Sequence, residues 1–451
     1  MRTIAALLLA GGLSGCVADF SVEYPAAPSE APGEAGMPEI DRGGPPEHPD
    51  PSADAARPGP DARRPDVPPA ADGAMDPPPD DLPPFAPAAA TLHRLTFDQY
   101  RNSIVDLFGV EPPADLEVDT PLHGFAAIGA TDLTISPRAA EQYETAAMTV
   151  VDQIFGDAGR RAALVGCDAA DPACARAFIE RSGRLIWRRP LQPAEAETFA
   201  ELARAIGEQL RDPWRGLGFA VAGLLQSPDF LFRVERGEPD PDRADRRRFT
   251  DHEMAERLSF LLWNSTPDEA LLDAADRGEL TDAAGLQAAA ERLLDDPRAR
   301  AAVGRFFAEY LSLDKLDHLE KDRAVFPQMS ETLGAAMRAE IAAVIDDLVF
   351  TRDADLRDLL TTRQTFIDPE LAALYQLPAV DDFGPVTLPA DGPRAGLMGM
   401  AGVLALNAHN TVTSPTHRGK YVQSKLLCFD IPPPPPGVAT NLDAVGQGQA
   451  L

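Results

Sequence analysis

Apolar side chains recur at helical spacing through most of the chain after residue 92, and the most consistent run is residues 250–296. One stripe in this run is spaced for a single buried helix face and consists of Met254, Leu258, Leu261 and Leu262. The expected helix starts are two capping boxes, Thr250 with Glu253 and Thr266 with Glu269, and two first-turn prolines, Pro267 and Pro297 behind Asp296. This part of the chain is therefore predicted to be mostly helical.

Helix signals of the same kind flank this run on both sides. Caps or first-turn prolines are expected at Thr96, Ser136, Pro193, Asp212 and Asp368, and a helix stop is expected at Gly109. A long helix should cover about residues 330–350. Residues 230–234 are the best candidate for a strand, with a buried helical turn as the alternative. Strands and helices do not alternate regularly, so we predict a mainly α protein, a multi-module helical array with few or no strands.

A chain of 451 residues is long enough for two or three hydrophobic cores. Composition and spacing divide it into successive segments. These are a lipoprotein signal peptide with lipobox (1–16), a disordered Pro-rich acidic tether (17–90), an N-terminal helical module (91–160), a helical module with a local cysteine pair (161–240), a central helical module (248–320), a C-terminal helical module ending in polyproline (321–438) and a tail (439–451).

The first residues have the pattern of an export signal. Arg2 precedes a short apolar core, and residues 13–16 (LSGC) look like a bacterial lipobox. The resemblance implies cleavage before Cys16 and lipid attachment to that cysteine, with a plain secretory signal as the alternative. No later segment reaches the roughly 20 apolar residues that a spanning helix needs. We therefore expect an exported protein that is lipid-anchored to the bacterial cell envelope, on its periplasmic or cell-surface side.

Residues 17–90 hold 19 of the 44 prolines, scattered acidic residues and few large apolar side chains. Such a segment cannot bury enough surface to offset its chain entropy. We predict a disordered tether, whose reach in the polyproline conformation is up to roughly 200 Å.

The formal net charge of −30 excludes one class of partner. An acidic surface repels the phosphate backbone, so nucleic acid is not an expected partner. The membrane is expected to be a partner only through the lipid anchor. The acidity itself is interpreted as a solubilising surface, with an acidic recognition patch as the alternative.

Cys167 and Cys174 form a local pair in an exported chain, which predicts a disulfide that closes a small loop, with two free thiols as the competing interpretation. Cys428 is then the odd cysteine, either buried or paired with a cysteine outside this sequence. Three nearby arginines are expected to pair with carboxylates, and a specific anion site is the alternative: Arg184, Arg188 and Arg189.

The segment that could carry chemistry is residues 394–436. Its candidate site residues are His409, Asn410, His417, Arg418 and Lys420, which surround the helix start expected at Ser414 and Pro415. A helix amino terminus flanked by polar side chains can bind an anion. The two histidines could bind a metal ion if Asp430 or a distant carboxylate supplied a third ligand. The competing interpretation is structural: these residue types are ordinary in a loop before a helix cap, and the three-residue spacing of Gly396, Gly399 and Gly402 lets helices approach closely.

Motifs of known enzyme classes are absent from the sequence. It has no Gly-x-Ser-x-Gly elbow, no His-Glu-x-x-His, no phosphate-binding loop and no dinucleotide fingerprint. It also lacks Cys-x-x-Cys-His, the attachment sequence for covalent haem. We therefore expect no cofactor in this chain, with a metal ion at His409 and His417 as the one alternative.

Seven phrases together resemble a known group of proteins. They are LTFDQYRNSIVDLFG (95–109), WRRPL (187–191), LLQSPDFLF (224–232), AERLSFLLWNSTPDEALL (255–272), DPR (296–298), TFIDPELAALY (365–375) and TSPTHRGKYVQSKLLCFDIPPPPP (413–436). In this order they resemble exported planctomycete and myxobacterial proteins built from serial domains of unknown function. The central module resembles domain of unknown function 1592, flanked by modules of the 1587, 1595 and 1588 types.

This resemblance carries no catalytic residues over, because no activity is established for the group. Its members commonly continue into a module with a Cys-x-x-Cys-His-like segment, and some carry cytochrome c domains, which implies a role near envelope electron transfer. This chain stops at Leu451, so it is either a fragment or has lost that module.

Two functions remain open at this point. The first is a non-catalytic binding or assembly component of the envelope, with an envelope protein or redox protein as partner. The second is a metal-dependent or hydrolytic enzyme with its site around His409 and His417, which requires the candidate side chains to converge in one concave pocket.

Overall fold

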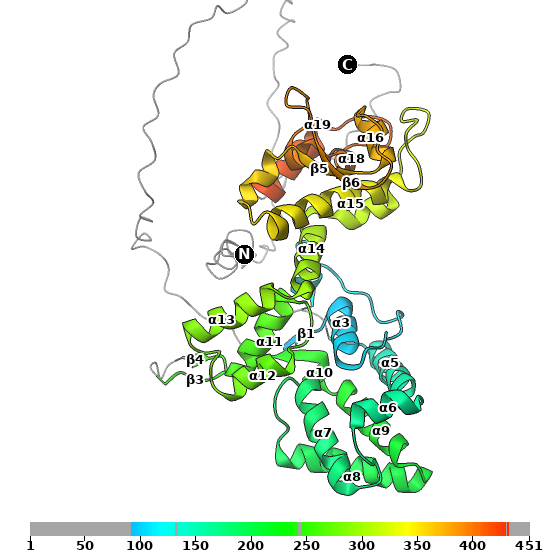
Figure 1. Cartoon of the computed structure of the whole chain (residues 1–451), viewed down its shortest axis with the longest axis vertical. Helices are drawn as coiled ribbons and strands as arrows, with labels where there is room; N and C mark the ends of the chain where they lie inside the picture. Colours follow the sequence, from blue (N-terminus) through cyan, green and yellow to red (C-terminus); the bar gives the residue numbers. More distant parts are fainter. Residues whose placement is uncertain (1–91, 131–133, 242–245, 430, 433–451) are drawn as a thin grey trace, which may run out of the picture. The chain divides into compact units, whose positions relative to one another are not determined.

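The structure is a computed structural model that describes residues 92–130, 134–241, 246–429 and 431–432. The expectations for residues 1–16, 17–90 and 439–451, and the lipidation of Cys16, lie outside these described residues. The described part is mainly α-helical and contains three small antiparallel sheets of two strands each (Figure 1). The prediction of a helical array with few strands is confirmed.

The first group of helices surrounds a core that includes Tyr100, Phe178 and Phe230. Its only sheet in the described residues pairs β1 (Leu92–Arg94) with β2 (Phe232–Val234), with Leu92 opposite Val234. The helices α8 (Pro193–Leu210) and α9 (Pro213–Gln226) can approach closely because Gly216 has no side chain. A Cβ atom at this position would lie about 2.1 Å from the carbonyl oxygen of Ala203. The helices of this group are α3 (Phe97–Phe108), α4 (Ala126–Gly129), α5 (Pro137–Phe155), α6 (Ala158–Val165), α7 (Pro172–Ile186), α8 (Pro193–Leu210), α9 (Pro213–Gln226) and α10 (Pro228–Leu231).

The second group packs around Trp263, whose Nε1 donates a hydrogen bond of 2.8 Å to the carbonyl of Leu293. The guanidinium of Arg298 lies over the indole ring at 3.4 Å from its centroid. The elements of this group are β3 (Glu238–Pro239), β4 (Arg247–Arg248), α11 (Asp251–Leu262), α12 (Glu269–Asp276), α13 (Ala283–Leu294) and α14 (Pro297–Leu311).

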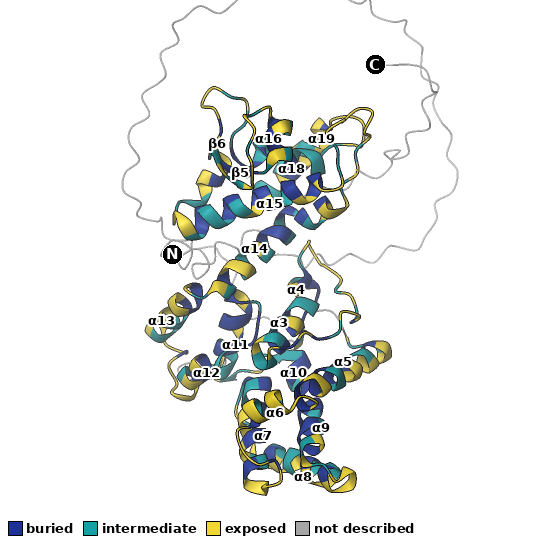
Figure 2. Ribbon diagram, turned by 45° about the vertical axis from the view of Figure 1, so that its right-hand side comes forward, coloured by how far each residue is buried: buried dark blue, intermediate teal, exposed yellow. Residues whose placement is uncertain are grey.

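The third group is organised around α15, which Figure 2 shows largely in the colours of buried and half-buried residues. Glu340 of α15 is fully buried and accepts hydrogen bonds of 2.6 Å from the hydroxyls of Thr365 and Tyr375. The elements of this group are η1 (Leu313–His318), α15 (Leu333–Asp346), η2 (Asp347–Thr351), η3 (Leu356–Leu360), β5 (Gln364–Ile367), α16 (Pro369–Tyr375), β6 (Gly384–Thr387), α17 (Gly396–Gly399), α18 (Ala401–Leu406), α19 (Pro415–Tyr421) and η4 (Val422–Leu426).

Most expected helix starts are confirmed. The capping residues found where the pattern predicted them are Thr96, Ser136, Asp212, Thr250, Asp296 and Asp368. The prediction of a cap at Thr266 is wrong. Asp268 caps α12 instead, because its carboxylate accepts from the amide of Leu271 and is also held by Arg292. Residues 230–234 divide between the end of α10 and strand β2, so both alternatives for this segment are partly right. None of the described helices combines the length and the apolarity that crossing a membrane requires.

Candidate functional site

A tight turn before α19 presents the first candidate histidine. Ala408 and Thr413 form an isolated antiparallel bridge, and the amide of His409 donates to the carbonyl of Val412 at 2.9 Å. Lys321 fixes the turn from outside, because its ammonium group donates to the carbonyls of Ala408 at 2.9 Å and His409 at 3.0 Å. Burial lowers the pKa of Lys321 below its ordinary value. The imidazole of His409 is exposed on this fixed turn.

The second candidate histidine lies in the first turn of α19. Ser414 caps this helix, and its hydroxyl accepts from the amide of His417 at 3.3 Å. The rings of His409 and His417 are adjacent, with centroids 4.8 Å apart and planes inclined by 50°. Both histidines are exposed. The structure therefore brings together, at the surface, two rings that the sequence separates by eight positions.

The other three candidates lie near these histidines in the chain but do not complete a metal site. Asn410 is exposed in the turn, and its carbonyl accepts from the amide of Asp322 at 3.1 Å. Arg418 is half-buried and Lys420 is exposed. Within the described ranges, no group of three or more His, Cys, Asp or Glu side chains is placed to hold a metal ion.

A shallow groove of about 630 Å³ runs beside this segment. It is lined mainly by apolar side chains, and its lining residues are Met398, Leu404, Arg418, Gly419, Val422, Gln423, Leu427 and Phe429. Arg418 is the only one of the five candidate residues among them. We call this feature the C-terminal groove.

Large apolar side chains are exposed in the last residues that line the C-terminal groove and just after them in the chain. Leu427 is 58% exposed, Phe429 is 64% exposed and Ile431 is 49% exposed. Reasoning from the sequence missed this surface, because its apolar residues come from α17, α18, η4 and the segment after η4. One signal could have indicated it: between Asp391 and Asp430 the sequence contains no Asp or Glu at all, in a chain that has 71 of them.

The arginines of residues 184–189 are paired with carboxylates, as predicted. Arg184 donates to Asp273 and Asp276, and Arg189 donates to Glu195 and Asp229; these bonds are between 2.6 and 3.0 Å. They hold the turn before α8 and join α7 to α12. These charges are therefore engaged within the protein.

Arg188 is buried more deeply than its neighbours and has a left-handed backbone (φ 59°). Its guanidinium donates to the carbonyls of Asp229, Phe230 and Phe232 at 2.7–3.2 Å, and its Nε lies 2.7 Å from Oε1 of Glu256. Burial raises the pKa of Glu256, and the two cations Arg188 and Arg233 act in the opposite direction. This cluster holds α10, β2 and α11 together.

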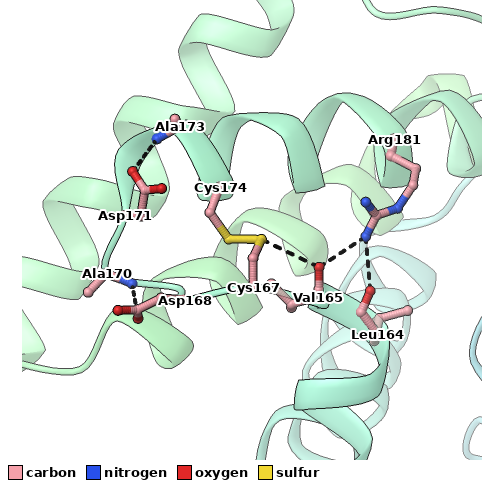
Figure 3. Close-up of a disulfide and its surroundings, with 9 residues drawn as sticks. All are labelled: Leu164, Val165, Cys167, Asp168, Ala170, Asp171, Ala173, Cys174 and Arg181. Carbon is pink, nitrogen blue, oxygen red and sulfur yellow. Dashed lines mark hydrogen bonds between the residues drawn. A yellow bond between two sulfur atoms is a disulfide. The ribbon is translucent and has the colours of Figure 1, made fainter.

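Cys167 and Cys174 are joined by a disulfide at the start of α7, which Figure 3 shows with its surroundings. The carboxylates of Asp168 and Asp171 accept from amides within the closed loop at 3.0 Å. Cys428 is exposed and is not a free thiol. The alternative in which Cys428 is buried is therefore wrong.

Four family models match the chain in succession. Each is described as a protein of unknown function: DUF1587 at residues 93–156, DUF1595 at 174–235, DUF1592 at 249–377 and DUF1588 at 394–450. The five candidate residues and the C-terminal groove lie within the DUF1588 match. No curated protein and no solved structure matches the chain. The chain thus carries successive matches to four domains of unknown function, with DUF1592 central and DUF1587, DUF1595 and DUF1588 flanking it.

Proposed function

We propose that this chain is an exported, lipid-anchored envelope protein that acts as a non-catalytic binding component. The C-terminal groove is its docking surface, and the partner is a protein with an acidic rim around an apolar patch. The observation that carries this proposal is the combination of exposed apolar side chains with cations that have no carboxylate partner among the described residues.

The cations of this surface differ from most arginines of the chain. Arg418 lines the groove, whereas Lys420 lies two residues further along α19 and outside the lining. Neither has an ion pair with any other described residue. Arginines elsewhere, such as Arg184 and Arg189, each contact two carboxylates. In a chain with a net charge of −30, cations without a partner among the described residues are available to a ligand of opposite charge.

The apolar part of the surface favours a protein partner over a small anion. Leu427 and Phe429 expose large side chains in the groove lining, and Ile431 is exposed two residues further along the chain. Burying such side chains is what stabilises the centre of a protein interface. Flanking cations then steer an acidic partner and fix its register. A protein with an acidic rim around an apolar patch would gain both the burial of apolar side chains and the attraction to the cations.

The envelope location rests on the lipobox that ends at Cys16, and the long acidic segment 17–90 would let the folded part work away from the membrane surface. An envelope redox protein is the partner that the family resemblance implies. Such a redox protein would need the acidic rim and the apolar patch that the docking surface requires.

The second function, a metal-dependent or hydrolytic enzyme, requires the candidate side chains to converge in one concave pocket. Among the five candidates, only Arg418 lines the C-terminal groove. His409, Asn410, His417 and Lys420 lie outside its lining. This arrangement favours binding over hydrolysis.

The docking surface can be tested by site-specific crosslinking in the native organism. A photoreactive amino acid replaces Phe429 in the full-length chain, and the crosslinked protein is identified and purified. Its affinity for the full-length protein is then measured with Arg418→Glu/Lys420→Glu and with a control in which two other exposed arginines are reversed, Arg138→Glu/Arg323→Glu. We expect at least a tenfold loss of affinity for the first variant, a much smaller loss for the control, and weakening with added salt.

Other outcomes would refute the docking proposal. Crosslinks only to the chain's own acidic residues 17–90, to a second copy of the chain, or to lipid would each identify a different occupant. Equal losses for the two charge-reversed variants would show that only the net charge matters.

The anchor is tested separately with Cys16→Ala. We expect the wild-type protein to incorporate labelled fatty acid and to sediment with membranes, and the variant to do neither. A variant that is still labelled and still sediments would contradict lipid attachment at Cys16.

A further inference from the structure

We propose that His409 and His417 bind one divalent transition-metal ion, of the kind that prefers imidazole ligands, such as Zn²⁺ or Cu²⁺. This inference is independent of the docking proposal, because neither histidine lines the C-terminal groove.

The distance between the rings fits a shared ion. An imidazole nitrogen lies about 2.0–2.1 Å from a bound zinc ion. Two imidazoles on one ion, at ligand angles between a right angle and the tetrahedral value, would therefore have centroids roughly 4.5–5.2 Å apart. The centroids of His409 and His417 are 4.8 Å apart. The 50° inclination of the planes also distinguishes the pair from two rings stacked face to face.

The backbone beneath both rings is held in place without a ligand. The turn of His409 is closed by the bridge between Ala408 and Thr413 and by the two hydrogen bonds from Lys321. His417 is fixed by the Ser414 cap of α19. An ion that binds two groups already positioned in this way orders little additional chain, which favours affinity.

The ligand types select the class of ion. Imidazole suits zinc, copper and nickel, whereas magnesium and calcium require oxygen ligands. No Asp or Glu occurs between residues 391 and 430, so nearby sequence supplies no carboxylate. No third His, Cys, Asp or Glu side chain of the described residues joins the pair, so water or a ligand from another molecule would take the remaining coordination positions, and the nearby Arg418 and Lys420 favour an anionic ligand.

The test uses the full-length protein without a histidine tag, in a buffer that does not bind metals, near pH 7.5. Calorimetric titration with Zn²⁺ and Cu²⁺ measures stoichiometry and affinity, and electron paramagnetic resonance of the Cu²⁺ form reports nitrogen ligands. The variants are His409→Ala and His417→Ala, with His318→Ala as a matched control, because His318 is also exposed.

We expect one ion per chain, at least a tenfold loss of affinity in each of the two test variants, and no change in the control. The copper spectrum should show two nitrogen ligands in the wild type and fewer in each test variant. All three replaced side chains are exposed, so the variants should keep the thermal midpoint of the wild type. Binding that is undetectable in the wild type, or that is unchanged by both substitutions, would overturn the proposal.

Discussion

Nε of Arg188 lies 2.7 Å from Oε1 of Glu256, and both side chains are buried where the turn before α8 meets α11. The two residues belong to different family matches, since Arg188 lies in DUF1595 and Glu256 in DUF1592. The pair therefore joins two domains that the family models treat as separate.

Removing one partner of this pair should strongly destabilise the protein. Glu256→Ala leaves the Arg188 charge buried without its carboxylate, and the expected loss in free energy of unfolding is about 3–5 kcal/mol. The exposed pair of Arg204 and Glu208 provides the control, since Arg204→Ala should cost only about 0.5 kcal/mol or less. Denaturant unfolding of both variants checks the difference, and a Glu256→Ala variant as stable as the control would contradict it.

Glu340 should make stability depend on pH in the direction opposite to a salt-bridged acid. Burial raises the pKa of Glu340 above its ordinary value of 4.5, so the folded state holds the proton more tightly than the unfolded chain. Its contribution to stability is therefore complete below pH 4.5 and is lost as the pH rises through the raised pKa.

The isosteric variant Glu340→Gln isolates this effect, because the amide mimics the protonated acid. The free energy of unfolding of the variant, minus that of the wild type, should increase as the pH rises from 4.5 towards neutrality. Thermal unfolding across this range measures the trend. A difference that stays constant with pH would show that Glu340 does not titrate differently in the folded state.

Gly396 should not tolerate even a methyl group. Its φ is +58°, and an added Cβ would lie 2.0 Å from the carbonyl oxygen of Leu360. We expect Gly396→Ala to cost at least about 2 kcal/mol, from backbone strain and the collision together. Gly304→Ala in α14 is the control, because nothing lies within 4 Å of its Cβ and the helix should gain about 0.5–1 kcal/mol. Opposite shifts of the thermal midpoint are expected, and shifts of the same sign would disprove the argument.

The disulfide between Cys167 and Cys174 closes a short loop, with a sequence separation of 7. In the chain-entropy account such a crosslink contributes about 2–3 kcal/mol by restricting the unfolded chain. The double variant Cys167→Ser/Cys174→Ser should therefore unfold at a lower denaturant concentration than the wild type under oxidising conditions. Coincident unfolding curves would show that this crosslink does not stabilise the protein.

Helix starts could be predicted from the sequence where the capping contacts are local. Thr250 and Glu253 cap α11 through bonds to each other's amides, and all the required atoms lie within four residues. The prediction failed at Thr266 because a distant residue decides the outcome. Arg292 holds both carboxylate oxygens of Asp268, which fixes that residue as the cap of α12.

The candidate site likewise depends partly on local sequence and partly on residues that are distant in the chain. The closeness of His409 and His417 in the sequence made them candidates, but the contact of their rings depends on the turn that Lys321 fixes from 88 positions away. The C-terminal groove could not be predicted from helical periodicity, because its lining comes from several short elements. Only folding brings Met398 and Phe429 to one surface.

The pairing of β1 with β2 also affects how the protein can fold during synthesis. Leu92 lies opposite Val234, so the partner of the first strand leaves the ribosome 142 residues later. At about 5–20 residues per second, β1 waits roughly 7–28 s for this partner. During that interval the backbone amides and carbonyls of β1 lack their partners in β2, so this short strand can pair with other chains.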